Sequence, residues 1–167
     1  MATKKAKEAH ALRQKNQKTY DSHNVEPTEL ADGTVVRSRL EALWVAEFEG
    51  CDSFHCIECA QVPVWIEGSY GPFLSNYKPD LVIYLADGSS VFVELKPTHE
   101  LAMADDRQKR ALKLNPRYKF AVIGGYPYSK RGVTLRLLTG KQELIHKNVP
   151  VCDVLKFMEC DCVDNGL

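Results

Sequence analysis

The chain lacks any apolar run long enough to cross a bilayer. Its first twenty residues are polar and basic, a pattern that does not predict a signal peptide. No internal repeat is visible. These absences exclude a membrane partner and predict a protein that works in the cytoplasm.

The chain has no net charge, since 22 basic residues balance 22 acidic ones. That balance would argue against a nucleic-acid partner, but the charges are segregated. Residues 1–20 hold six basic residues against one acidic, residues 21–99 four against thirteen, and residues 100–131 eight against three. Basic segments around an acidic one suit a metal-dependent nuclease, because cations hold phosphates and carboxylates hold metal. For residues 1–20 the alternative is a solvated, disordered arm.

Length and composition fit one α/β domain, because 167 residues that are 44% hydrophobic can build a substantial core. We expect residues 1–30 to form a basic, flexible arm and linker. Residues 31–167 are then expected to form a single domain.

Residues 77–97 predict a β-hairpin, in which two apolar runs, 81–85 and 91–95, flank a turn that ends at Gly88. A three-residue loop with Gly88 in the left-handed conformation pairs Asp80 with Glu94. Lys96 then falls on the same face as Glu94, about 6.6 Å away. The opposite face is wholly apolar.

Two carboxylates and one ammonium at the end of a hairpin form a site for a hard cation such as Mg²⁺ or Mn²⁺. The chemistry that this favours is metal-assisted hydrolysis of a phosphodiester, with Lys96 positioning the attacking water or neutralising developing charge. The alternative is an ordinary strand-entry turn followed by polar residues on the solvent face of a hairpin.

The order Pro79-Asp80, then Glu94-Leu95-Lys96 on the next strand, resembles the PD-(D/E)xK signature of the restriction-endonuclease-like nucleases. Upstream, residues 36–41 resemble the RSxLE segment of several members. Downstream, residues 105–109 resemble a DDRxK segment of the phage endonuclease I family of Holliday-junction resolvases. The order and approximate spacing match from Arg37 to Ile123.

This resemblance implies a restriction-endonuclease-like α/β fold, a mixed sheet whose central hairpin carries the site and whose apolar face is covered by helices. It implies a Mg²⁺-dependent DNA endonuclease, in which Asp80 and Glu94 bind the metal and Glu41 completes the acidic cluster. Lys96 is the fourth catalytic residue. The expected phosphate contacts are basic residues on both sides of the hairpin, namely Arg37, Arg39, Arg107 and Lys109.

The resolvase likeness further implies branched phage DNA as substrate, a homodimer that cuts two strands, and the host cytoplasm as the place of action. Residues 94–97 also resemble nuclease subunits of some transposons and small phage head-completion nucleases. Two alternatives therefore stand beside the endonuclease. One is a subunit that is active only within an assembly, and the other is a non-catalytic interaction module that keeps the fold.

Other patterns predict the elements around the hairpin. Ser38 can cap a helix through Phe48, and Glu41 also fits the capping box of that helix, which is the alternative to metal ligation. We expect the first strand of the sheet at residues 62–66 and one helix at 100–114. A strand should follow at 117–123, reached by a parallel crossover, and another at 133–138. Short helices are expected at 141–147 and 151–160.

The six cysteines are not expected to form disulfides, because the sequence does not predict a secretory signal. Four of them could form a tetrahedral zinc site, namely Cys56, Cys59, Cys160 and Cys162. The alternative is that they are small buried hydrophobes and surface thiols.

Overall fold

The computed structural model describes residues 27–51, 54–58, 63–67 and 74–162, without the side chains of residues 54–56, 58 and 160–162. It is a mixed α/β structure. The chain divides into two units, Met1–Ala42 and Leu43–Leu167, with the division inside helix α2 (Arg39–Glu49).

The described part of the first unit is small. Strands β1 (Thr28–Glu29) and β2 (Val35–Val36) pair antiparallel, and the first turn of α2 follows. Val36 and Leu40 are its buried apolar residues. The predicted helix after Ser38 is confirmed, since α2 runs to Glu49.

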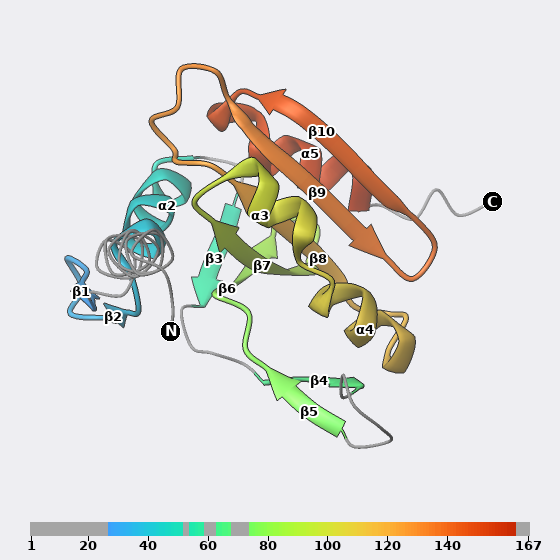
Figure 1. Ribbon diagram of the computed structural model, residues 1–167. Helices are drawn as coiled ribbons and strands as arrows, with labels where there is room; N and C mark the ends of the chain where they lie inside the picture. Colours follow the sequence, from blue (N-terminus) through green and yellow to red (C-terminus); the bar gives the residue numbers. More distant parts are fainter. Residues whose placement is uncertain (1–26, 52–53, 59–62, 68–73, 163–167) are drawn as a thin grey trace, which may run out of the picture. The chain divides into compact units, whose positions relative to one another are not determined.

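The second unit contains a six-stranded mixed sheet in the order β10-β9-β8-β7-β6-β3 (Figure 1). All neighbouring strands are antiparallel except β7 and β8, which are parallel as the crossover predicted. The strands are β3 Phe54–Glu58, β6 Leu81–Leu85, β7 Ser90–Lys96, β8 Lys119–Gly124, β9 Val133–Thr139 and β10 Glu143–Val149.

The hairpin of β6 and β7 has the predicted register. Leu81 lies opposite Val93 and Ile83 opposite Val91, so Asp80 comes opposite Glu94. The Leu85 N–H donates to the Ser89 carbonyl (2.8 Å), which leaves a three-residue loop. Gly88 in that loop has φ +85°, a conformation that suits glycine because it lacks a Cβ.

One predicted strand was assigned to the wrong sheet. Residues 62–66 were expected to begin the main sheet, but β4 (Val64–Glu67) pairs with β5 (Leu74–Tyr77) in a separate two-stranded sheet. The edge of the main sheet beside β6 is formed by β3. Alternation in β4 still places Val64 and Ile66 in the core, but the alternation does not reveal which strand will be the partner.

Helices α3 (His99–Ala104) and α4 (Arg107–Leu114) replace the single helix expected at 100–114. The helix is interrupted at Asp105, whose backbone is extended (φ −76°, ψ 118°) and whose carboxylate accepts a hydrogen bond from the Arg107 N–H (3.1 Å). An aspartate that bonds to the backbone two residues on competes with helix continuation. The following Gln108 is fully buried.

The C-terminal part corrects one further prediction. Residues 141–147 are not a helix, because β10 pairs with β9 as a hairpin. The helix at 151–160 is confirmed as a 3-10 turn (Val151–Asp153) that leads into α5 (Val154–Cys162).

The two faces of the sheet are covered by different helices (Figure 1). Helix α3 packs against β7, β8 and β9. On the other face α5 packs against β9, and its Phe157 ring lies 4.6 Å from the ring of His146. The core under α3 and α4 includes Tyr77 and Phe120. None of the helices in the described ranges is sufficiently long and apolar to cross a membrane.

Candidate active site

The open end of the β6–β7 hairpin brings Asp80 and Glu94 together. The Asp80 N–H donates to the Val93 carbonyl (2.9 Å), and its Oδ2 accepts from the Leu95 N–H (2.7 Å). Both carboxylates are buried. The hairpin backbone therefore fixes Asp80 beside the strand that carries Glu94 and Lys96.

Glu94 is the centre of an ion-pair cluster. Its Oε1 lies 2.7 Å from the Lys96 Nζ and accepts a hydrogen bond from the Arg107 Nη2. The Asp105 Oδ2 lies 3.3 Å from the Lys96 Nζ and 2.6 Å from the Arg107 Nη2. Two cations from β7 and α4 thus bridge two carboxylates from β7 and the α3–α4 break.

Asp105 holds Arg107 through several hydrogen bonds at once. In addition to Nη2, the Arg107 Nε donates to Asp105 Oδ1 (3.0 Å). Burial opposes the ionisation of Asp105, but these hydrogen bonds and the charges of Arg107 and Lys96 outweigh it. They hold the pKa of Asp105 well below its usual range. The hydrogen bond to Asp105 also raises the pKa of Arg107, despite its partial burial.

The Tyr77 ring packs against the guanidinium of Arg107. The Arg107 Cζ lies 4.8 Å from the centre of the Tyr77 ring, a cation–π contact. Burial and the charge of Glu94 raise the pKa of the Tyr77 phenol, so that it stays neutral. Its oxygen accepts from the Gln108 Nε2 (3.3 Å). Strand β5 and helix α4 therefore fix the plane of Arg107.

One carboxylate oxygen of Glu94 makes no hydrogen bond to the described residues. Its Oε2 is buried and has no hydrogen-bond partner among the described residues. A buried carboxylate oxygen without a donor is costly, and a cation would remove that cost. No group of three or more His, Cys, Asp or Glu side chains suited to a metal occurs in the described part. The buried carboxylates of Asp80 and Glu94 offer oxygen ligands, which suit a hard cation that takes few protein ligands and keeps several waters.

A buried arginine on β9, Arg136, also supports the site. Arg136 lies opposite Val122 of β8, which itself lies opposite Glu94, so the three positions form one row across the sheet. Arg136 Nε donates to Glu143 Oε1 (2.6 Å), and its Nη1 donates to the carbonyls of Ala102 and Asp105. It therefore holds the end of α3 and the backbone of the α3–α4 break.

Glu41 lies in the first unit, in the first turn of α2. Its N–H donates to the Ser38 Oγ (3.2 Å), and its carboxylate accepts from the Arg37 N–H (3.1 Å). The helix-cap role expected as an alternative is thus present. The metal role of Glu41 stays a prediction.

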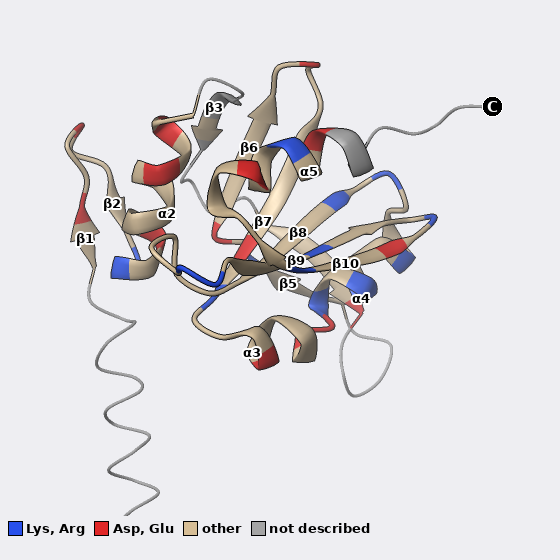
Figure 2. Ribbon diagram, turned by 90° about the horizontal axis from the view of Figure 1, so that it is seen from above, with Lys and Arg blue, Asp and Glu red and all other residues tan. Residues whose placement is uncertain are grey.

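The four predicted phosphate contacts differ in their surroundings. Arg37 pairs with Glu41 (3.5 Å) and Arg39 is exposed, both in the first unit. In the second unit, Arg107 belongs to the cluster around Glu94, and the Lys109 Nζ lies 2.6 Å from Glu143 Oε2. The basic positions of α4 and the acidic positions of α2 are visible in Figure 2.

The predicted zinc ligands lie outside what the structure describes. Cys59 falls between described ranges, and the side chains of Cys56, Cys160 and Cys162 are not described. Among the described cysteines, Cys51 and Cys152 are not in disulfides, and the Cys51 thiol donates to the Glu47 carbonyl (3.4 Å).

Asp105 is the site residue that sequence reasoning missed. It was noticed only as part of a segment with a family likeness, and Arg107 was assigned to phosphate contact. The available signal was its place two residues before an arginine in that segment. Comparison with protein-family models, curated proteins and solved structures found no significant match to the chain.

Proposed function

We propose that the chain is a metal-dependent endonuclease with a restriction-endonuclease-like fold, hydrolysing phosphodiester bonds in DNA. The observation that carries this proposal is the cluster at the end of β7. There Asp80 and Glu94 face each other across the hairpin, Lys96 contacts Glu94, and Glu94 Oε2 has no partner among the described residues.

Asp80 and Glu94 are the residues that would hold a divalent cation such as Mg²⁺ or Mn²⁺. When bound, the cation would supply polarisation of a phosphoryl oxygen and compensation of developing charge. The carboxylates are already positioned, because backbone pairing and the Leu95 N–H hold Asp80 in place. Such prior positioning avoids reorganisation during the reaction.

Lys96 is the third member of the site. Its side chain is 21% exposed, so it reaches solvent while its Nζ contacts both Glu94 and Asp105. An ammonium held in this way can orient an attacking water and stabilise negative charge on the phosphorane-like transition state. Arg107 shares the same two carboxylates and orients them relative to Lys96.

The wider substrate proposal follows from the family likeness of the sequence. Branched phage DNA is the preferred substrate, and a homodimer in the host cytoplasm is the form that would cut two strands. The alternative with structural support is a non-catalytic module. Lys96 and Arg107 already neutralise Glu94 Oε1, and a network of this kind can be purely structural.

The test is cleavage of labelled linear duplex, single strand and four-way junction in Mg²⁺, Mn²⁺ or EDTA. We expect metal-dependent cutting that Glu94→Gln and Lys96→Ala each reduce at least about a hundredfold. EDTA should abolish it. Binding of DNA should persist in Glu94→Gln, because this carboxylate is proposed to hold metal rather than phosphate.

Matched controls lie away from the cluster. Glu100→Gln changes an exposed glutamate of α3, and Lys156→Ala an exposed lysine of α5 on the other face of the sheet. Both should cut like the wild type. Thermal unfolding of every variant checks that it is folded. If the folded wild type cuts none of the three DNAs, or if Lys96→Ala cuts normally, the endonuclease proposal is wrong.

A further inference from the structure

A loop begins at the strand end that carries Lys96. Strands β7 and β8 are parallel and end together, with Lys96 opposite Gly124. The Gly125 N–H donates to the Lys96 carbonyl (2.9 Å). The connection from β8 to β9, residues 125–132, therefore leaves the sheet directly beside the candidate site (Figure 1).

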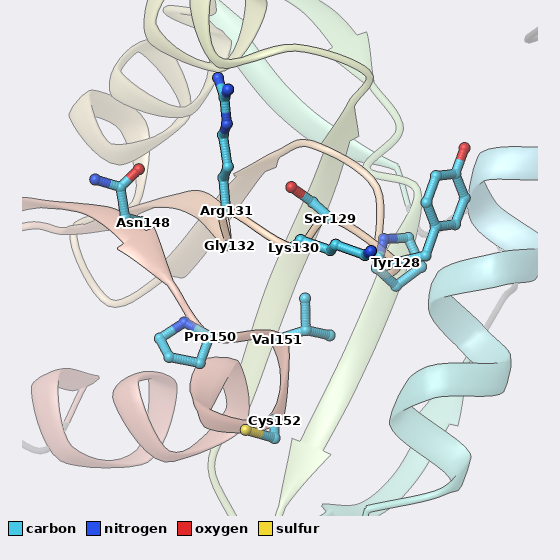
Figure 3. Close-up of a pocket in the computed structure, with 10 residues that line it drawn as sticks. Tyr128, Ser129, Lys130, Arg131, Gly132, Asn148, Pro150, Val151 and Cys152 are labelled. Carbon is cyan, nitrogen blue, oxygen red and sulfur yellow. The ribbon is translucent and has the colours of Figure 1, made fainter.

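Two adjoining surface pockets lie along this loop, and together we call them the loop groove. One, of about 390 Å³, lies between residues 127–132 and the segment around Pro150 (Figure 3). The other, of about 400 Å³, extends from Pro97 and Thr98 to β10. Both are lined by Gly132 and Asn148, so the groove leads from the residue after Lys96 to the tip of the loop.

The loop groove is basic. Lys130, Arg131 and Lys147 line it, and no aspartate or glutamate does. All three cations are exposed, and within the described ranges none pairs with a carboxylate. Figure 3 shows the side chains of Lys130 and Arg131 diverging from neighbouring positions of the loop. Such a local basic surface attracts phosphates, although the chain as a whole has no net charge.

An exposed aromatic ring stands at the tip of the groove. Tyr128 is 69% exposed, and its ring stacks on that of Tyr126 at 5.2 Å and 27°. The loop that presents it is folded, because the Ser129 N–H donates to the Tyr126 carbonyl (3.0 Å) and the Gly132 N–H to the Ser129 carbonyl (3.1 Å). The Trp44 indole also donates to the carbonyl at the start of the loop (3.1 Å). The Tyr128 ring is therefore preorganised before any ligand binds.

The backbone beneath the groove is constrained. Asn148 has φ 57° at an irregularity in β10, and Gly132 has φ +75°. A Cβ on Gly132 would lie 2.5 Å from the Val149 carbonyl. Loop and strand thus approach as closely as glycine allows. A positive φ at a residue other than glycine, as at Asn148, costs free energy and persists where the surrounding structure imposes it, often at binding sites.

We infer that the loop groove binds a single-stranded segment of the nucleic acid next to the cleavage site. Lys130, Arg131 and Lys147 contact phosphates, and Tyr128 stacks on an unpaired base. Cations that follow a backbone and an exposed aromatic that accepts a base are the two features that single-strand binding requires. The inference rests on the proposed nuclease function, to which it adds a substrate with unpaired bases beside the cut.

The test measures binding of labelled oligo-dT and of a blunt duplex by fluorescence anisotropy in EDTA, so that cleavage plays no part. Tyr128→Ala should weaken oligo-dT binding roughly five- to hundredfold and leave duplex binding within about twofold. Tyr128→Phe should bind like the wild type, because it keeps the ring. The double variant Lys130→Ala/Arg131→Ala should lower the slope of log K against log salt by about 1.4 for oligo-dT.

Trp65→Ala is the matched control, since Trp65 is an exposed aromatic on β4 and is not a lining residue of the groove. It should not change binding. Equal binding by Tyr128→Ala and the wild type, equal loss in Trp65→Ala, or no binding of oligo-dT by the wild type would each overturn the inference. Cleavage that depends on Lys96 would then leave the nuclease proposal standing. Groove-dependent binding without cleavage by any form would instead reject the nuclease and retain the groove.

Discussion

Replacing Asp105 by asparagine tests whether the cluster around Glu94 depends on the α3–α4 break. Asp105 is the common acceptor for Lys96 and for the Nε, Nη2 and backbone N–H of Arg107. Asparagine keeps the shape but removes the charge and turns an amide towards one of these donors. We expect Asp105→Asn to destabilise the protein by about 2–3 kcal/mol.

The magnitude follows from burial. Breaking a fully buried ion pair costs about 3–5 kcal/mol, because the remaining charge is left without compensation. The Asp105 side chain is 5% exposed, but those of Arg107 and Lys96 are 36% and 21% exposed. Water can therefore rehydrate part of both cations, and we reduce the expected cost accordingly. In thermal unfolding it corresponds to a drop of about 5–10 °C.

The pH dependence gives a second, independent readout. The pKa of Asp105 is lowered in the folded state, so its stabilisation is complete above the unfolded value of about 3.9 and is lost as the pH falls towards the folded value. The difference between wild type and Asp105→Asn should be constant from about pH 8 to pH 5 and should shrink below about pH 4.

Urea unfolding followed by circular dichroism measures both quantities. The control is Asp106→Asn, which changes the adjacent aspartate. Asp106 is exposed and makes no side-chain cap on α4, so its replacement should cost less than about 1 kcal/mol. Equal stability of the two variants at pH 7, or a gap for Asp105→Asn that widens in acid, would refute the role assigned to Asp105.

Two further comparisons test the support of the site and the turns. Arg136→Met should lower the free energy of unfolding in urea by about 2–4 kcal/mol, because it leaves two carbonyls at the end of α3 without their donor. Lys109→Met removes an exposed partner of Glu143, which Arg136 also contacts, and should lower it by less than about 1 kcal/mol. Equal losses in the two variants would count against the buried network. Gly88→Ala should lose about 1 kcal/mol, since only its positive φ opposes a side chain. Gly132→Ala adds a collision with backbone and should melt several degrees lower than Gly88→Ala; similar melting temperatures would contradict the close approach of loop and strand.

Local sequence was sufficient for the hairpin. Alternation from 81 to 95 and a glycine at 88 determine both the faces and the register, and the structure pairs the strands in that way. The proximity of Asp80, Glu94 and Lys96 follows from that register. The expected helix at 141–147 failed because its polar and apolar residues suit a half-exposed edge strand equally well, and only pairing with β9 decides between the two.

The sequence by itself determined the elements whose partners are near in the chain: the β6–β7 hairpin, α2 after Ser38, and the parallel β8. Tertiary structure decided everything that depends on distant partners. It placed β3 beside β6 and moved β4 to a second sheet. It also broke a continuous helical pattern at Asp105, whose carboxylate accepts from the Arg107 N–H and pairs with Lys96, because such a side-chain bond to the backbone competes with helix continuation. Short-range periodicity records which face of an element is apolar, whereas the partner of each face is determined only when the whole chain packs.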